Sequence, residues 1–317
     1  MTKRKKISLI GGGNIGGTLA FMIANKGIAD VVIFDRRDTF AKGKALDIEQ
    51  SLPVNRQEIN LIGTNDPADL KDSDVIIITA GVARKPGMSR DDLLNTNKDV
   101  IKSVAANVKQ YAPNAFVIVI TNPLDAILYA FLHYSGLPRN KVIGMAGVLD
   151  TARYKLFLAR ELNLTVCDIS AFVLGGHGDT MVPLLKYTNI SGIPILDLVK
   201  KGKISEEKLN AIIERTKKGG AEIVKLLETG SAFYAPASSA LEIAESYIFD
   251  QRKTLPCSVL LQGEYDINDS CMGVPVIIGK NGIEEIIELQ LDKQERESFD
   301  NSAQAVNRLI NDIKNIL

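Results

Sequence analysis

The stretch KISLIGGGNIGGTLAFMIANKGIADVVIFD, residues 6 to 35, decides the fold. A short apolar run ends in three glycines, a helix-like segment follows from about Asn14 to Lys26, and a second apolar run, DVVIFD, comes after it. Apolar runs that are continuous rather than alternating are typical of strands buried on both faces of a parallel sheet. The stretch therefore predicts a strand, a helix and a second strand parallel to the first.

A glycine-rich turn between the first strand and the helix fits the pattern G-x-G-x-x-G. It comprises Gly11, Gly12, Gly13, Asn14, Ile15 and Gly16. In this pattern the first glycine makes a tight turn, the second lets the backbone approach a pyrophosphate, and the third lets the helix pack on the strand. The helix N-terminus then offers free N–H groups to the phosphates. The turn predicts a dinucleotide-binding site.

An acidic residue at the end of the second strand indicates which dinucleotide binds. Asp35 follows Gly16 by nineteen residues, where a carboxylate can bond the ribose hydroxyls of an adenosine. The same carboxylate repels a 2′-phosphate, so the sequence favours NAD over NADP as cofactor. Arg36 and Arg37 follow directly and leave NADP open, because a guanidinium can accept the phosphate.

Further strand and helix patterns give the architecture of the whole chain. The strands DVIIITAG (74–81), FVIVITNP (116–123) and KVIGMAG (141–147) alternate with helix-like segments, which predicts an α/β, Rossmann-type doubly wound parallel sheet. The pattern changes after residue 147. We expect an NAD-binding domain over residues 1–147 and an α+β substrate domain over residues 148–317.

The second half opens with a helical pattern, VLDTARYKLFLARELN, followed by the strands DISAFVLGG and NISGIPI. A helical stretch rich in lysine and glutamate spans 205–228. A hairpin-like segment with turns at NDS (268–270) and KNG (280–282) follows, and a terminal helix starts at about Lys293. These elements are the basis for expecting an α+β domain.

Composition limits the possible partners. The 38 basic residues balance 38 acidic ones, and this disfavours a surface for nucleic acid or an anionic membrane. No stretch approaches the roughly eighteen apolar residues of a membrane span, and the apolar run near the N-terminus is too short for a signal peptide. The three cysteines, Cys167, Cys257 and Cys271, are widely spaced, which suggests reduced thiols in a cytoplasmic protein with no metal site. We expect a small-molecule substrate.

Two loops at the ends of predicted strands carry polar groups. The loop GVARKPGMSRDDLLNTN (81–97) places Arg84 and Arg90 directly after a core strand, and TNPLDA (121–126) places Asn122 at the same edge of the sheet. Ligands bind at the carboxyl ends of the strands in this architecture, so the two arginines suggest an anionic substrate.

His177 lies in GGHGDTMVP (175–183), where the surrounding glycines leave the backbone unusually free. Asp150 and Arg153 in LDTAR stand three residues apart on one helical face. Oxidation of an alcohol needs a hydride acceptor, a base for the hydroxyl proton and a cation near the developing oxyanion, and a nicotinamide, His177 and Arg90 could supply these. His133 has no such neighbours and is expected to be structural.

Five separated motifs, GGGNIG, ITAGVARKPGMSR, VITNPLD, GVLDTAR and GGHGDTMVP, resemble those of the lactate/malate dehydrogenase family along the whole chain. The resemblance implies NAD as cofactor and a homotetramer or homodimer. It implies His177 as the proton-transferring base, Asp150 as its carboxylate partner and Arg153 as the clamp on the substrate carboxylate. Asn122 and Arg90 would contact the reacting oxygen, and Asn97, Ile120, Thr121 and Asn122 would contact the cofactor.

Arg84 separates the two main substrates of that family. A lactate-type site would have glutamine there, whereas arginine can pair with the second carboxylate of malate and oxaloacetate; Met88 also fits the malate pattern. We predict reversible hydride transfer between (S)-malate and NAD, as in the tricarboxylic acid cycle, with L-lactate as the alternative substrate. A non-catalytic dinucleotide sensor would leave the charged constellation unexplained. A metal-dependent, NAD-using glycosidase would need a cysteine and histidine ligand set that the sequence lacks.

Overall fold

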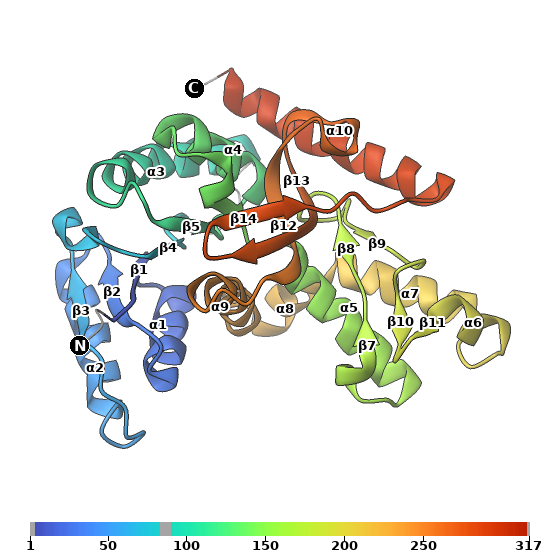
Figure 1. Ribbon diagram of the computed structural model, residues 1–317, viewed down its shortest axis with the longest axis horizontal. Coiled ribbons are helices and arrows are strands. Elements are labelled where there is room, and N and C mark those ends of the chain that lie inside the picture. Colours follow the sequence, from blue (N-terminus) through green and yellow to red (C-terminus); the bar gives the residue numbers. More distant parts are fainter. Residues whose placement is uncertain (1–3, 83–89, 316–317) are drawn as a thin grey trace.

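The computed structural model describes residues 4–82 and 90–315, with only the backbone for residues 90–95. Within this part of the chain, one nine-stranded sheet runs through the molecule in the order β14-β13-β12-β6-β5-β4-β1-β2-β3 (Figure 1). Its strands are β1 (Lys6–Ile10), β2 (Asp30–Phe34), β3 (Leu61–Thr64), β4 (Val75–Ile78), β5 (Phe116–Val119), β6 (Val142–Gly144), β12 (Lys253–Gln262), β13 (Asn268–Gly279) and β14 (Gly282–Ile286).

The first six strands are parallel and have the order 3-2-1-4-5-6. This is the order of doubly wound dinucleotide-binding folds, which confirms the predicted fold class. Ile7 of β1 lies between Val31 of β2 and Val75 of β4, and all three side chains are buried. Because the strands are parallel, their carboxyl ends meet at one edge of the sheet. The short edge strand β3 is absent from the sequence-based prediction, because its four residues, LIGT, carry little apolar signal.

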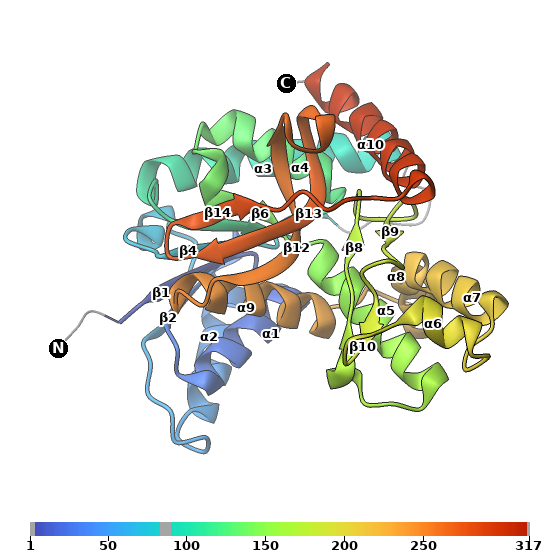
Figure 2. The same cartoon turned by 45° about the vertical axis from the view of Figure 1, so that its right-hand side comes forward.

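Helices cover both faces of the sheet, as Figure 2 shows. On one face lie α1 (Asn14–Lys26), α2 (Asp38–Ser51) and α9 (Tyr234–Ile248), and on the other lie α3 (Arg90–Tyr111), α4 (Leu124–Ser135) and α10 (Lys293–Lys314). Helix α1 spans the predicted residues, and it ends at Gly27, whose left-handed backbone (φ 63°) suits glycine. Helix α9 is also absent from the prediction, because its sequence YAPASSALEIAESYI is rich in small residues.

The remaining elements form a smaller module beside the sheet, with a core that includes Tyr154, Leu158 and Ile195. They are α5 (Gly147–Leu162), β7 (Ile169–Ser170), β8 (Val173–Leu174), β9 (Val182–Pro183), β10 (Asn189–Ile190), β11 (Ile193–Pro194), α6 (Ile195–Lys200), α7 (Glu206–Lys217) and α8 (Gly219–Leu227). Short 3₁₀ helices connect elements of both parts: η1 (Pro67–Leu70), η2 (Arg139–Lys141), η3 (Val166–Asp168) and η4 (Glu264–Asp266).

Two details of the second half differ from the prediction. The NDS segment is not a turn: residues 268–270 belong to β13, and the chain reverses instead at residues 263–267, around Gly263 with φ 123°. The helical stretch 205–228 is divided at Lys218 into α7 and α8, because two glycines follow and glycine weakens a helix interior. The KNG turn and the terminal helix from Lys293 are confirmed.

Strands β12, β13 and β14 extend the first sheet antiparallel rather than forming a sheet of their own, and Ser258 of β12 pairs with Gly144 of β6. Strands from both sides of the predicted boundary between residues 147 and 148 thus belong to one sheet. The domain boundary stays a prediction. In the part of the chain that the structure describes, no helix combines the length and apolarity needed to cross a membrane. The same residues contain no cluster of three or more histidine, cysteine or acidic side chains that could hold a metal ion.

Candidate active site

The glycine-rich turn after β1 has the shape that a pyrophosphate requires. Gly11 has φ 111°, and a Cβ there would lie 2.6 Å from Oγ1 of Thr79. A Cβ on Gly16 would lie 1.9 Å from the carbonyl oxygen of Gly11, so only glycine lets α1 approach the strand so closely. A Cβ on Gly13, in contrast, would meet nothing within 4 Å. The N-cap residue of α1, Gly13, makes no side-chain cap, so no capping side chain occupies the first N–H groups of this helix.

Asp35 follows β2 and is already held in place. Its Oδ2 accepts a hydrogen bond from the backbone N–H of Gly12 (2.9 Å), and its Oδ1 accepts from the backbone N–H and the Nε of Arg37 (3.0 and 3.2 Å). Burial opposes ionisation, but the bonds from Arg37 and Gly12 outweigh it and hold the pKa of Asp35 below its usual range. The carboxylate of Asp35 is therefore charged, and it lies beside the glycine-rich turn of residues 11–16.

The guanidinium of Arg37 contacts both a carboxylate and an aromatic ring. Its guanidinium bonds Asp35 and lies 3.8 Å from the ring centroid of Phe40. Both contacts stabilise the cation where it is. A 2′-phosphate would have to displace the Asp35 carboxylate to reach this guanidinium, so the geometry favours NAD.

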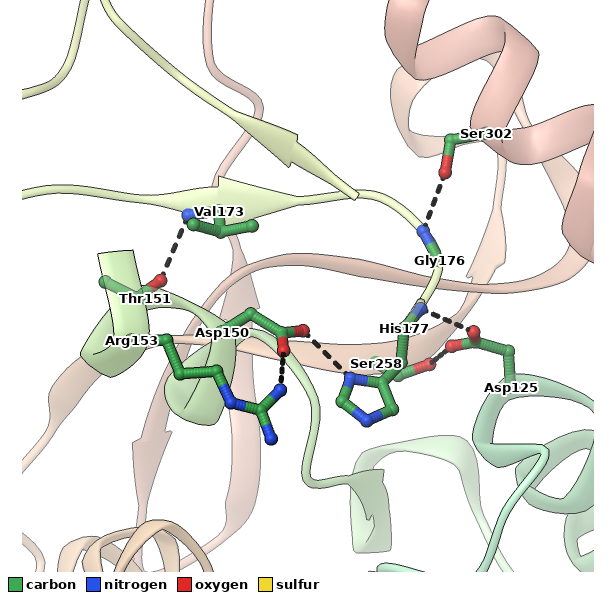
Figure 3. A network of polar contacts seen from close by, with 9 residues as sticks. All are labelled: Asp125, Asp150, Thr151, Arg153, Val173, Gly176, His177, Ser258 and Ser302. Carbon is green, nitrogen blue, oxygen red and sulfur yellow. Dashed lines mark hydrogen bonds and ion pairs between the residues drawn. The ribbon is translucent and has the colours of Figure 1, made fainter. Parts of the chain in front are cut away.

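His177 and Asp150 form a hydrogen-bonded pair, as Figure 3 shows, and His177 lines the same cavity as Ile120 and Asn122, which follow the carboxyl end of β5. Nδ1 of His177 lies 2.8 Å from Oδ2 of Asp150, and Asp150 Oδ1 accepts a bond from Nη1 of Arg153 (3.2 Å). Asp150 is 2 % exposed and lies in the first turn of α5, one turn before Arg153. A carboxylate only accepts, so Nδ1 carries the proton and Nε2 is left as the acceptor in the neutral ring.

The surroundings of His177 favour its protonated form. Burial disfavours the imidazolium, but the charge and hydrogen bond of Asp150, together with the charge of Asp125, outweigh burial and the nearby Arg153, and they raise the pKa of His177 above 6.5. A histidine ring held by a carboxylate at Nδ1 can both accept and return a proton at Nε2.

One cavity of about 330 Å³ brings several predicted residues together. Ile15 from the phosphate turn, Ile120 and Asn122 from the end of β5, Arg153 from α5 and His177 all line it. The sequence did not point to the apolar wall of this cavity, which includes Met145, Leu149, Met181, Val224 and Pro236. Leu149 and Met181 lie within the motifs GVLDTAR and GGHGDTMVP, but an apolar side chain inside a motif carries no signal of its own that it lines a cavity, so only the folded chain reveals this wall.

Asn97 and Thr121 direct their polar groups to the backbone. The amide of Asn97 accepts from Val82 N–H (2.7 Å) and donates to the carbonyls of Val82 (3.2 Å) and Asn122 (2.7 Å). Thr121 donates to the carbonyl of Ala80 (2.7 Å). Both residues thus join the loops after β4 and β5. Arg84 and Met88 lie outside the described residues, and Arg90 begins α3 with only its backbone described.

A glycine-rich turn after the first strand and a hydrogen-bonded histidine–aspartate pair are features that an NAD-dependent oxidoreductase needs. The chain matches the family models for the lactate/malate dehydrogenase NAD binding domain over residues 5–144 and the lactate/malate dehydrogenase alpha/beta C-terminal domain over residues 147–317. The chain belongs to the lactate/malate dehydrogenase family. It is therefore an NAD-dependent oxidoreductase of 2-hydroxy acids, which confirms the predicted cofactor.

Individual relatives cover the full chain. Malate dehydrogenase from Ehrlichia canis (strain Jake) is 55% identical over 313 residues, 99% of this chain and 100% of the relative. The crystal structure of Cryptosporidium parvum malate dehydrogenase superposes with a TM-score of 0.96 at 48% identity, covering 99% of this chain and 100% of that one. The lactate dehydrogenase of the same organism, complexed with lactic acid and nicotinamide adenine dinucleotide, gives 0.96 at 43% identity and covers 99% of both chains.

Proposed function

We propose that this protein is a malate dehydrogenase that interconverts (S)-malate and oxaloacetate. The observation that carries the proposal is the His177–Asp150 pair in a cavity that also contains the phosphate-turn residue Ile15. The full-length relatives from Ehrlichia canis and Ehrlichia chaffeensis, both 55% identical and both malate dehydrogenases, support the choice of substrate.

His177 is the proposed base. Its Nε2 takes the proton of the C2 hydroxyl as malate is oxidised, while Asp150 keeps Nδ1 protonated and stabilises the imidazolium that forms. The chemistry that bound NAD would supply here is an acceptor for the hydride of C2. In the reverse direction the imidazolium returns the proton to the carbonyl oxygen. Asn122 lines the same cavity and is the proposed donor to that oxygen, with Arg90 as the cation that polarises it.

Arg153 is the proposed anchor for the C1 carboxylate. Its Nε is buried and has no hydrogen-bond partner among the described residues, although Nη1 bonds Asp150. An unpaired buried N–H of a cation is costly unless a ligand completes it. A carboxylate can take two parallel bonds from a guanidinium, so substrate binding would satisfy this group.

Besides the malate dehydrogenase relatives, the choice of malate over lactate rests on Arg84 in the sequence, since solved structures of both kinds of enzyme resemble this chain equally in fold. The test is a comparison of kcat/KM for oxaloacetate, pyruvate and α-ketoglutarate with NADH. We expect oxaloacetate to exceed the other two by at least about two orders of magnitude, near 3 kcal/mol. Faster turnover of pyruvate would assign the lactate alternative, and no turnover of any 2-oxo acid would remove the dehydrogenase proposal.

We also propose a cytoplasmic homotetramer or homodimer. Two of the three cysteines, Cys257 and Cys271, are buried as free thiols, which fits a reducing compartment. Large apolar side chains such as Leu46 on α2 and Phe249 after α9 are at least half exposed, at 55% and 50%, and a second subunit could cover them. Sedimentation velocity of the purified protein distinguishes these assemblies from a monomer.

A further inference from the structure

Helices α7 and α8 meet at an elbow, residues 217–220, that lies directly against Arg153. A Cβ on Gly219 would lie 3.0 Å from Cδ and 3.4 Å from Nε of Arg153, and a Cβ on Gly220 would lie 3.8 Å from Nη2. Glycine at position 219 therefore lets the backbone of the elbow approach the stem of the proposed substrate anchor. The Nε at this contact is the atom that has no hydrogen-bond partner among the described residues.

Helix α7 packs on the face of α5 that carries Arg153, and Figures 1 and 2 show the two helices side by side. Arg153, Phe157 and Glu161 follow one another at intervals of four residues, so they share this face. The guanidinium of Arg215 in α7 lies 4.2 Å from the ring centroid of Phe157, and Nζ of Lys208 lies 3.3 Å from Oε1 of Glu161. Contacts thus run along α5 from the start of α7 to the elbow.

An ion pair spans the elbow. Nε and Nη2 of Arg215 donate to Oε2 and Oε1 of Glu222 in α8, at 2.9 and 2.7 Å. Two parallel bonds between a guanidinium and a carboxylate fix the orientation of both groups as well as their distance. The hydrogen bonds of this pair raise the pKa of Arg215 and lower the pKa of Glu222, and the charge of Arg160 in α5 also lowers the pKa of Glu222. Arg215 therefore joins α5, α7 and α8.

We propose, resting on the function above, that Arg215 and Glu222 are positioning residues: their ion pair keeps the elbow against Arg153 and so orients its guanidinium for the C1 carboxylate of the substrate. Asp150 bonds Nη1 of Arg153, and the elbow lies against Nε and Nη2, so the two contacts together restrain the guanidinium. Neither Arg215 nor Glu222 lines the cavity that contains His177. Both residues therefore act through Arg153, on substrate affinity and not on proton transfer.

Two substitutions break the ion pair, and a third is the matched control. Glu222→Gln keeps the size of the side chain and removes its charge, and Arg215→Met keeps an apolar stem over Phe157 but removes the guanidinium. Glu161→Gln breaks the pair with Lys208, which joins α5 to α7 without crossing the elbow. The side chains of the two pairs are similarly exposed, at 48% and 36% for Arg215 and Glu222 and 61% and 35% for Lys208 and Glu161. A general effect of losing a surface ion pair should therefore appear in the control as well.

Hydrogen exchange of the substrate-free protein measures how firmly the elbow is held. Mass spectrometry of peptides that cover α8, residues 219–227, reports on its backbone amides. We expect Glu222→Gln and Arg215→Met to speed exchange in α8 by at least about threefold, because the opening of this helix no longer breaks the ion pair. Glu161→Gln should leave exchange in α8 as in the wild type. Unchanged exchange in both test variants would overturn the role of the pair in holding the elbow.

Steady-state kinetics separate binding from chemistry. At saturating NADH we expect both test variants to raise KM for oxaloacetate by at least about threefold while kcat stays within about twofold, since Arg153 would bind the carboxylate in the ground state and the transition state alike. The ratio of variant to wild-type KM should shrink in about 0.5 M salt, because salt screens an exposed ion pair. A lower kcat with an unchanged KM would contradict a role in substrate binding.

A double-variant comparison tests whether the effect passes through Arg153. In an Arg153→Lys background, where the planar guanidinium is already absent, Glu222→Gln should change kcat/KM by less than about 1.5-fold. The same loss of about threefold or more in both backgrounds would instead show a general structural defect and overturn the positioning role.

NADH binding, followed by fluorescence, verifies that each variant folds, and if Arg215→Met does not bind NADH, Glu222→Gln alone decides. Every 2-oxo acid carries the C1 carboxylate, so a wild type that prefers pyruvate is compared with its variants on pyruvate. The exchange measurement uses no substrate. A wild type that reduces no 2-oxo acid would therefore refute the proposed function, whereas the exchange result on the elbow would stand.

Discussion

His177 combines a raised pKa with two carboxylates that reach it from different helices. The pKa lies above 6.5 because Asp150 and Asp125 together outweigh burial and Arg153. If His177 is the proton-transferring group, as proposed, oxaloacetate reduction uses the imidazolium, so its kcat/KM should fall as the pH rises through this raised pKa. Malate oxidation uses the neutral ring and should rise over the same range. Initial rates in both directions between about pH 5 and 9 check the sign, and parallel profiles would contradict it.

Loss of the ring should abolish proton transfer while leaving cofactor binding intact. We expect His177→Asn to lower kcat by roughly four orders of magnitude or more, since the general base is removed, and to keep the NADH dissociation constant within about threefold. Stopped-flow reduction of oxaloacetate and fluorescence titration of NADH measure the two quantities. A variant that retains most of its activity would show that another group transfers the proton.

Asp35 should determine the choice of dinucleotide. Its carboxylate is charged and holds Arg37 through Oδ1, so a 2′-phosphate meets repulsion. Asp35→Ser removes the repulsion and releases Arg37. We expect the ratio of kcat/KM for NADH over NADPH to drop by at least about tenfold, or 1.4 kcal/mol. Equal use of both cofactors by the wild type would show that Arg36 or Arg37 already accepts the phosphate.

Arg84 should determine the choice of 2-oxo acid. A charge-assisted pair with the distal carboxylate of oxaloacetate, once broken, costs about 2–5 kcal/mol, or roughly thirty- to several-thousand-fold in kcat/KM. Arg84→Gln should therefore lower oxaloacetate activity and raise pyruvate activity, because pyruvate leaves the cation without a partner. If the ratio of the two kcat/KM values changes by less than about threefold, Arg84 does not select the substrate.

At the scale of elements, local chemistry makes some features predictable and others not. Helix α1 and the turn before it follow from glycine positions, so their bounds are predictable. The NDS segment has the composition of a turn but extends β13, because its partner strand β12 continues to Gln262 and pairs with Asn268. The buried hydrogen bonds of Asp125 are likewise not predictable from the sequence, because they also depend on partners distant along the chain. A single acidic residue in an apolar helix gives no spacing pattern, and its partners, at residues 177 and 258, come close only after folding.

The contact between α10 and the His177 loop can be tested by overpacking. A Cβ on Gly176 would lie 2.4 Å from Cγ2 of Val306 in α10. Gly176→Ala should cost about 1–3 kcal/mol of stability and displace His177, lowering kcat by at least about tenfold. Val306→Ala removes the obstructing methyl groups, so the double variant should recover activity relative to Gly176→Ala. Urea denaturation and kcat of the four proteins give the coupling energy, and strict additivity would argue against this contact.

At the scale of the whole molecule, one sheet and one helix join the two halves of the chain. The main hydrophobic core runs from Ile7 in β1 to Ile313 in α10. Helix α5 contributes Val148 and Leu149 to this core, and Tyr154 and Leu158 to the smaller module. Residues from both halves of the chain therefore pack in the main core, and α5 links this core to the smaller module. This packing favours cooperative unfolding.

Calorimetry tests this cooperativity. Because α5 belongs to both cores, we expect a single unfolding transition that moves as a whole when a ligand binds. NADH at about one hundred times its dissociation constant adds roughly 2.7 kcal/mol to the free energy of unfolding, which raises Tm by several degrees. NADPH at the same concentration should raise Tm less, since Asp35 weakens its binding. Two transitions, of which NADH shifts only the first, would instead show that the chain unfolds as two independent domains divided near residue 147.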